Sequence, residues 1–300
     1  MNWNSKALTL IVLLVLTTFA QSQERKMVVT IDDLPVVKGG SIARQRAVTH
    51  GILRHLSDRQ VQAIGFVNEK KLGTPPKPEF VALLRAWLKR GHELGNHTFS
   101  HPRFFTTPYD EYVADTAKGH KVSKKLLAEF GKTIRYFRHP YLSTGPSKQA
   151  KDDFEKTLKR WNYEIAPVTI DNSEWKFAHA YDKANGNQAR RDKIVKAYLD
   201  YMVEMTEFYE KYSRDLIGEE PPQILLIHAN ALNAHHLGSL LDRFSKRGYE
   251  FITLEEALKH PVYSRKDDYV GPKGISWLQR WAISEGRKFR PEPTVPHWIE

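Results

Sequence analysis

Five short segments of the sequence carry polar side chains that could do metal or acid–base chemistry. Each follows or ends an expected strand. They are residues 30–33 (TIDD), 97–101 (HTFSH), 138–141 (RHPY), 171–175 (DNSEW) and 225–228 (LLIH). In α/β folds the functional groups lie where parallel strands end. We therefore expect these segments to build one site.

The histidines at 97 and 101 are spaced as metal ligands could be. Four residues apart, both imidazoles can converge on one cation, at roughly 2.0 to 2.1 Å each for zinc. The spacing alone is a weak signal, but Asp33 adds a hard oxygen donor directly after a β-branched, buried run. Two His and one carboxylate leave a coordination position open, which is typical of a catalytic zinc rather than a structural one.

The absence of cysteine narrows the donor set. It excludes a disulfide scaffold, a Cys-ligated zinc finger, an iron–sulfur protein and a cysteine nucleophile, so any metal must be held by His and carboxylate. A cation on Asp33 would also divide the roles of the adjacent carboxylates, leaving Asp32 free to accept a proton. The alternative for an isolated Asp pair after a strand is a turn or a helix cap.

Taken in order, T-x-D-D, H-T-x-x-H, R-x-P-Y, D-x-x-E-W and L-x-x-H resemble the five motifs of the polysaccharide deacetylases, the NodB-homology domain of carbohydrate esterase family 4. The resemblance covers about residues 27–260. It implies an α/β fold, a distorted (β/α) barrel of the NodB-homology type, and metal-dependent removal of N- or O-acetyl groups from a sugar.

The resemblance also implies a division of labour at the metal. Asp32 corresponds to the general base, and Asp33, His97 and His101 to the ligands of a divalent metal. Zn²⁺ is the expected ion, with Co²⁺, Ni²⁺ and Mn²⁺ as alternatives. Arg138 would orient the base and keep its pKa low.

The remaining motif positions would serve the oxyanion and the leaving group. The backbone N–H of Tyr141 would complete an oxyanion hole. His228 corresponds to the general acid, held protonated by Glu174 or, as a second choice, by Asp171. The walls of its pocket would come from two further side chains, Leu225 and Trp175.

The sequence departs from the family pattern at three places. Leu34-Pro35 follows the Asp pair where glycine is usual, His139 places an extra imidazole near the site, and Ala229-Asn230 follow the last motif where an aspartate is common. No catalytic group is lost, but the substrate class stays open.

Short apolar runs alternate with helical patterns, which favours parallel strands joined by helices. Strands are expected at 27–31, 63–67, 93–96, 134–138, 164–170, 223–228 and 249–253, and helices at 42–56, 78–90, 109–130, 148–161, 237–247 and 254–259. We interpret residues 26–260 as one catalytic domain with a helical insertion at about 176–220. Residues 261–300 would be an extension packed on the core. Its tryptophans, 277, 281 and 298, favour core packing over a sugar-stacking platform.

The N-terminus and the charge bear on location. Residues 1–22 are typical of a signal peptide, with one Lys before an uncharged run; an uncleaved anchor is the alternative. The formal charge is +11, from 46 Lys plus Arg against 35 Asp plus Glu. The basic residues are scattered, which indicates a solvated surface. We expect a secreted or periplasmic protein without a nucleic-acid partner, in contact at most with anionic cell-envelope material.

The leading hypothesis is a secreted hydrolase that removes N-acetyl groups from an amino sugar of an acetylated glycan. The same site could instead cleave an O-acetyl ester or a formamide. A carbohydrate-binding protein without turnover is disfavoured because base, acid and all three ligands are present together. The sugar and the oligomeric state are left open.

Overall fold

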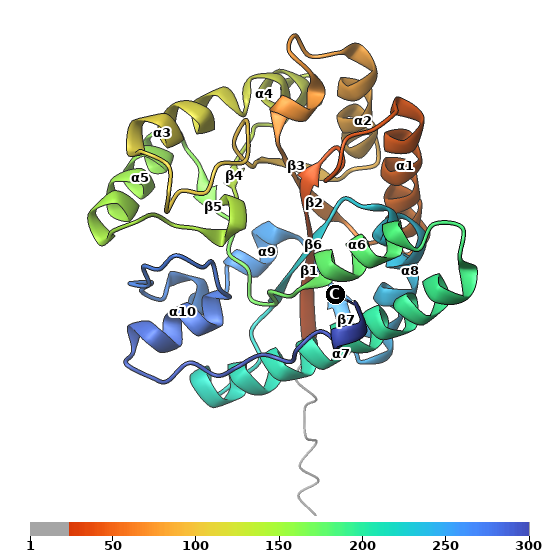
Figure 1. The fold of residues 1–300 in the computed structure, drawn as a ribbon. Helices are drawn as coiled ribbons and strands as arrows, with labels where there is room; N and C mark the ends of the chain where they lie inside the picture. The colour runs from red at the N-terminus through yellow and green to blue at the C-terminus, as the bar shows by residue number, and fades with distance from the viewer. Residues whose placement is uncertain (1–23, 300) are drawn as a thin grey trace, which may run out of the picture.

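A parallel sheet forms the centre of the molecule (Figure 1). The computed structural model describes residues 24–299, so the expected signal peptide lies outside the described residues. Apolar, β-branched runs such as MVVTI in the first strand are buried on both faces, as strands covered by helices require. The strands are β1 (Arg25–Leu34), β2 (Ala63–Val67), β3 (Glu93–Asn96), β4 (Tyr136–Phe137), β5 (Glu164–Ile165), β6 (Gln223–His228) and β7 (Tyr249–Phe251).

The sheet curls into an irregular barrel. Its order is β5-β4-β3-β2-β1-β6, with β7 paired to the start of β1. The segment after β5 turns toward the opposite end of this order, where Ile170 forms a parallel bridge with Leu225 of β6. Backbone bonds from Thr169 N–H to the Ile224 carbonyl (3.1 Å) support this closure. The expected distorted (β/α) barrel is thereby confirmed.

Helices surround the barrel, and several of them begin at a side-chain cap. They are α1 (Ile42–Asp58), α2 (Pro78–Lys89), α3 (Tyr109–Lys118), α4 (Lys121–Ala128), α5 (Lys148–Arg160), α8 (Ala231–Lys246) and α9 (Leu254–Leu258), with short 3₁₀ turns η1 (Glu69–Leu72) and η2 (Pro140–Leu142). Helix α8 begins earlier than the expected residue 237, because the Asn230 side chain accepts the Asn233 N–H (3.0 Å) and caps the helix there.

The single helix expected over 109–130 is wrong, since α3 and α4 are separated at Gly119 and His120. Gly119 packs against the backbone of the 97–101 loop. A Cβ at this position would lie 2.3 Å from the carbonyl carbon of Thr98. The break therefore lets the chain approach that loop closely.

The two segments outside the alternating pattern pack together. The insertion forms two helices, α6 (Glu174–Lys183) and α7 (Gln188–Ile217). The C-terminal residues form η3 (Pro261–Ser264), α10 (Trp277–Ser284) and η4 (His297–Ile299) and run along α7 (Figure 1). Among residues 24–299, no helix is both long and apolar enough to cross a bilayer.

Trp281 makes the C-terminal segment part of the hydrophobic core, because its indole is only 1% exposed, whereas Trp298 is 40% exposed. We predict that Trp281→Ala lowers the free energy of unfolding by about 3 to 5 kcal/mol through the cavity it leaves. The same change at Trp298, which has Lys193 over its ring, should cost about 1 kcal/mol or less. Urea unfolding followed by circular dichroism measures both; equally small losses would contradict a core role for Trp281.

Candidate active site

The candidate site lies at the carboxyl ends of the strands, on both sides of the β1–β6 pair. Asp32 at the end of β1 is in register with His228 at the end of β6. The other three polar segments follow β3, β4 and the bridge at Ile170. The structure therefore brings all five predicted segments to one edge of the barrel.

Asp33, His97 and His101 form a cluster that could hold a metal ion. One donor atom from each residue lies within 4.8 Å of the others. The His97 Nδ1–H donates a hydrogen bond to the Arg138 carbonyl (2.8 Å). This bond fixes the ring and leaves Nε2 to face the cluster. One carboxylate and two imidazoles are a donor set that suits Zn²⁺ and related divalent ions.

The backbone at the cluster is held in conformations that L-residues rarely adopt. The φ angles of Asp33 (72°) and His101 (65°) are both in the left-handed region. Such residues cost about 1 to 3 kcal/mol each and persist where the surrounding structure enforces them. Asp33 lies within β1, where the pairing with β2 is irregular between Ile31 and Leu34, and His101 lies in the loop after β3.

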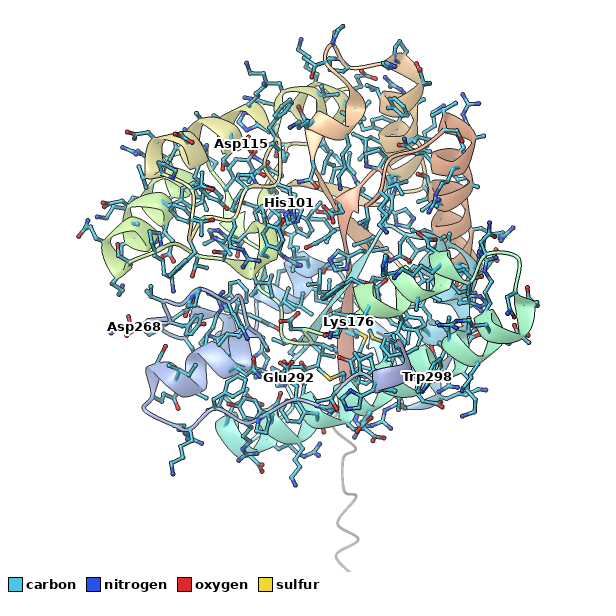
Figure 2. All side chains as sticks on the ribbon, in the orientation of Figure 1. His101, Asp115, Lys176, Asp268, Glu292 and Trp298 are labelled. Atoms are coloured by element: carbon cyan, nitrogen blue, oxygen red, sulfur yellow. The ribbon has the colours of Figure 1, made fainter. Side chains whose placement is uncertain are left out.

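Asp115 on α3 braces the loop that carries the two histidines. Its carboxylate accepts the backbone N–H groups of Phe99 and Ser100 (both 2.9 Å) and the Ser100 hydroxyl (2.7 Å). Figure 2 labels Asp115 on α3 and His101 on the loop nearby. The bonds restrict the loop to the turn that directs His97 and His101 at Asp33.

The electrostatics of the cluster favour neutral imidazoles and an ionised carboxylate. Burial lowers the pKa of His97 and of His101 to about 3. Burial also opposes the charge on Asp33, but Lys71 and the imidazoles outweigh it and hold its pKa below the usual range. These are the protonation states in which the three groups bind a cation.

Lys71 is a site residue that the sequence analysis missed. Its ammonium lies 2.9 Å from Asp33 Oδ1 and donates to the Asp33 carbonyl oxygen (3.1 Å). It sits in η1, just after β2, in a segment that carries no recognisable motif. Only the pairing of β2 beside β1 could have indicated that it reaches Asp33.

Arg138 contacts Asp32 as predicted, although the net electrostatic effect differs. The guanidinium is fully buried, lies 3.3 Å from Asp32 Oδ1, and is fixed by bonds to the Ala166 carbonyl (2.8 Å) and the Thr30 hydroxyl (3.0 Å). Burial raises the pKa of Asp32, and Arg138 acts against this without reversing it. A raised carboxyl pKa makes Asp32 a stronger base once ionised.

His228 bonds to Glu174 rather than to Asp171. Its Nδ1 lies 2.9 Å from Glu174 Oε2, and Glu174 is fully buried. Burial lowers the pKa of His228, but the bond to Glu174 raises it overall to about 9. Asp171 accepts the N–H of Asn172 (2.9 Å), and burial together with the charge of Glu292 raises its pKa to about 7.

Two buried asparagine amides hold Glu174 in place. The Asn233 amide donates to Glu174 Oε1 (2.7 Å) and the Asn230 amide donates to the same oxygen (2.5 Å). Asn233 in turn accepts the hydroxyl of Tyr198 on α7 (2.7 Å). Both asparagines therefore support the carboxylate that holds His228.

Two exposed aromatic side chains are close to residues of the site, Tyr141 beside His101 and Trp175 next to Glu174 in the sequence. Tyr141 is 49% exposed, with its ring 4.5 Å from that of His101 and the Arg103 guanidinium 4.1 Å from its centre. Trp175, at the start of α6, is 56% exposed. Both present apolar rings where a sugar could stack.

Two further predicted residues lie in the interior. Leu225 is fully buried within β6, and its carbonyl accepts the Thr30 hydroxyl (2.7 Å). His139 is 2% exposed, bonds the Tyr112 hydroxyl (3.3 Å) and packs edge-on against Phe137. Its surroundings are thus those of an aromatic core cluster, and burial holds its pKa well below the ordinary value.

Comparison with known proteins agrees with this arrangement. Residues 20–166 match the family model of polysaccharide deacetylase. This match places residues 20–166 in the polysaccharide deacetylase family. The matched part includes the first three of the five motifs, and the structure adds the last two at the same edge.

Two curated relatives are named as peptidoglycan deacetylases. Peptidoglycan-N-acetylglucosamine deacetylase PgdA of Listeria monocytogenes is 23% identical over 233 residues, which are 77% of this chain and 38% of that protein. A peptidoglycan-N-acetylglucosamine deacetylase of Bacillus cereus is 27% identical over 128 residues, 43% of this chain and 42% of the other. The chain spans less than half the length of these relatives.

Solved structures from the polysaccharide deacetylase family share the fold. Peptidoglycan deacetylase PdaC from Bacillus subtilis has a TM-score of 0.50 at 21% identity, covering 81% of this chain and 95% of that one. A family 4 carbohydrate esterase pseudoenzyme from Bacillus anthracis has a TM-score of 0.53 at 15% identity, covering 85% and 69%. Because the fold includes a pseudoenzyme, activity has to be argued from the site itself.

Proposed function

We propose that this chain is a metal-dependent hydrolase that removes N-acetyl groups from an amino sugar in an oligo- or polysaccharide. The observation that carries the proposal is the convergence of a buried carboxylate, a three-donor cluster and a Glu-bonded imidazole at one edge of the barrel. The substrates named for the curated relatives make peptidoglycan N-acetylglucosamine the first glycan to test.

Asp33, His97 and His101 would hold the metal, with Zn²⁺ as the first choice. When bound, a divalent cation supplies Lewis acidity that polarises an acyl oxygen and makes water more acidic. The neutral imidazoles and the ionised carboxylate need no proton rearrangement to receive it. The buried position of His97 also limits competing solvent at the site.

The residues of the chain then divide the proton transfers. Asp32, held by Arg138, accepts a proton from the attacking water. The backbone N–H of Tyr141 stabilises the negative charge that develops on the acyl oxygen. His228, with Nδ1 engaged by Glu174, donates a proton from Nε2 to the amine as the carbon–nitrogen bond breaks, releasing acetate.

Acetate release tests the proposal directly. The metal-loaded mature protein is incubated with peptidoglycan, chitin oligomers, acetylated xylan and N-formyl sugars, and freed acetate or formate is measured. Release from the N-acetyl substrates is expected. Release only from acetylated xylan or formyl sugars would show that the site cleaves esters or formamides instead. Glycan binding without any release would favour a binding protein without catalytic activity.

Location follows from the same proposal. A secreted or periplasmic protein would meet peptidoglycan, and its net positive charge, +11 for the full chain and +10 without residues 1–22, would favour anionic envelope polymers. Fractionation of cells that produce the tagged full chain, followed by N-terminal sequencing of the extracellular form, tests both export and cleavage near residue 22.

The Glu174–His228 pair predicts the alkaline limit of activity. His228 donates only when protonated, so kcat/KM should fall as the pH rises through about 9. Because its folded pKa lies above the ordinary value, the pair stabilises the fold fully below about pH 6.5, and this contribution is lost as the pH rises through about 9.

Glu174→Gln should move this alkaline limb to lower pH by about 1 to 3 units, because the neutral amide no longer favours the imidazolium. The measurement is kcat/KM across about pH 6 to 10. Glu250→Gln, an exposed change on β7, is the matched control. An unmoved alkaline limb would remove His228 from the role of acid.

A further inference from the structure

Arg280 links the C-terminal segment to the loop that carries Tyr141. Its side chain is fully buried on α10. The guanidinium donates to the carbonyl oxygen of Leu142 and to the hydroxyl of Thr144 (3.1 Å). Both acceptors lie within three residues of Tyr141, so a side chain far away in sequence fixes the backbone that follows this residue.

The charge of Arg280 is compensated within the same interface. Asp267 Oδ2 lies 3.3 Å from the guanidinium and 2.6 Å from Nζ of Lys151, which is itself buried on α5. The Trp277 ring covers the guanidinium at 4.1 Å. A buried arginine with a carboxylate and an aromatic face has little freedom to move, which makes it a rigid support.

Gly274 shows how closely the C-terminal segment approaches the loop. A Cβ at this position would lie 1.9 Å from the carbonyl oxygen of Tyr141 and 2.6 Å from Cβ of Leu142. Two further bonds tie the neighbouring residues to the barrel, from the Ser276 hydroxyl to the Thr169 carbonyl (2.6 Å) and from Trp277 N–H to the Val168 carbonyl (2.7 Å). The two backbones are therefore packed directly against each other.

The supported loop has an unfavourable backbone. Tyr141 and Leu142 have φ angles of 57° and 51°, consecutive left-handed residues that both carry side chains. Such conformations are retained only when contacts around them oppose relaxation. Arg280 and Gly274 supply those contacts from the C-terminal side.

We propose that the C-terminal segment 267–280 positions the backbone of Tyr141 for charge stabilisation, with Arg280 as the positioning residue. The inference rests on the proposed deacetylation for its kinetic consequence, because a donor displaced by about 1 Å can cost on the order of 100-fold in rate. Its structural part, the support of the 139–144 loop, does not depend on any substrate.

Arg280→Met in the full chain is the principal test. We expect amides in residues 139–144 to exchange hydrogen about tenfold faster, while the 97–101 loop keeps its exchange and zinc binds with unchanged stoichiometry. kcat should fall about 10- to 100-fold with KM within about threefold, because the group that moves serves the transition state. Arg280→Lys, which keeps the charge, should give an intermediate value.

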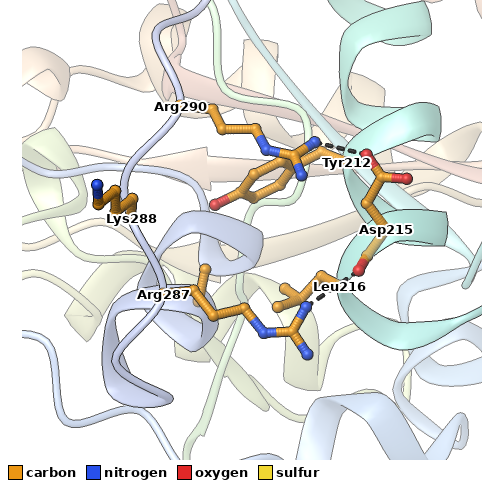
Figure 3. Close-up of a pocket in the computed structure, with 7 residues that line it drawn as sticks. Tyr212, Asp215, Leu216, Arg287, Lys288 and Arg290 are labelled. Carbon is orange, nitrogen blue, oxygen red and sulfur yellow. Dashed lines mark hydrogen bonds and ion pairs between the residues drawn. The ribbon is translucent and has the colours of Figure 1, made fainter.

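Arg290→Met is the matched control. Arg290 lies in the C-terminal extension 261–300, beyond segment 267–280, and pairs with Asp215 on α7. Arg287 beside it donates to the Asp215 carbonyl (3.0 Å) (Figure 3). Loss of Arg290 removes one arginine and one ion pair without touching the Tyr141 loop. Exchange in 139–144 and kcat should both stay at the wild-type level.

Gly274→Ala keeps the proposal testable if Arg280→Met does not fold, because the added methyl pushes on the Tyr141 carbonyl and removes no buried charge. Unchanged exchange in 139–144 for a folded Arg280 or Gly274 variant would overturn the positioning role. An equal rise in exchange and an equal fall in kcat in the Arg290 control would show that Arg280 contributes only to general stability. A wild type inactive on every glycan would instead sink the proposed function, while the exchange result would still decide the support of the loop.

Discussion

Asp32→Asn is expected to lower kcat by about 10²- to 10⁴-fold, with KM within about threefold of the wild type. The amide is nearly isosteric and can still meet the Arg138 guanidinium, which lies 3.3 Å from the carboxylate. It cannot accept a proton at neutral pH. The change therefore removes the proposed base while leaving the surrounding packing in place.

Metal binding separates a lost base from a lost ligand in this variant. Asp32 Oδ2 lies 3.6 Å from Nε2 of His97, so it borders the cluster without belonging to the three donors. Zinc stoichiometry and thermal unfolding should match the wild type, as they should for the exposed control Asp58→Asn. Wild-type kcat in Asp32→Asn would refute the base assignment, and lost zinc would make Asp32 a ligand.

His97→Ala should weaken zinc binding by about 100-fold or more and abolish measurable acetate release. Loss of outer partners already costs about 10- to 100-fold in affinity, and a direct ligand contributes more. His97 is 1% exposed and its Nδ1 is anchored on the Arg138 carbonyl, so no neighbouring imidazole can take its place without moving the loop.

Competition with a chromophoric chelator measures the affinity, and elemental analysis measures the bound metal. His50→Ala on α1 is the matched control because this imidazole is exposed and on a helix outside the strand ends. Stoichiometric zinc of wild-type affinity in folded His97→Ala would overturn the ligand assignment, whatever happened to activity.

The strand-end motifs are predictable because each joins side chains capable of chemistry to an apolar run that marks the end of a strand. TIDD ends a β-branched run, and LLIH ends another, so parallel pairing alone aligns Asp32 with His228. The family resemblance also implies Arg138 as the partner of Asp32. These interactions depend on elements that every barrel of this kind must align.

The supporting residues could not be predicted because their partners are distant in sequence and chemically ordinary. Lys71 is one basic residue among many, and only the β1–β2 pairing brings it to Asp33. Tyr198 reaches Glu174 through Asn233 from a helix that the sequence presents as a charged insertion. Arg280 likewise has no local signal of burial.

Two predictions of helix boundaries were wrong, each for its own reason. The periodic pattern through 109–130 continues across Gly119, and only the close approach of the 97–101 backbone explains why the chain turns there. The early start of α8 could have been recognised from Asn230, a favoured capping residue directly after His228. Tertiary contact decides the first case and local capping the second.

The register of β1 and β6 sets how this site would fail on heating. Asp32 and His228 occupy facing positions on two adjacent buried strands, joined by backbone bonds such as Ala229 N–H to the Asp32 carbonyl (3.1 Å). Buried core strands open only with the whole domain, whereas loops at the rim open locally. Mild warming should therefore first weaken substrate binding by the rim loops. The distance between Asp32 and His228 should persist until the barrel itself unfolds.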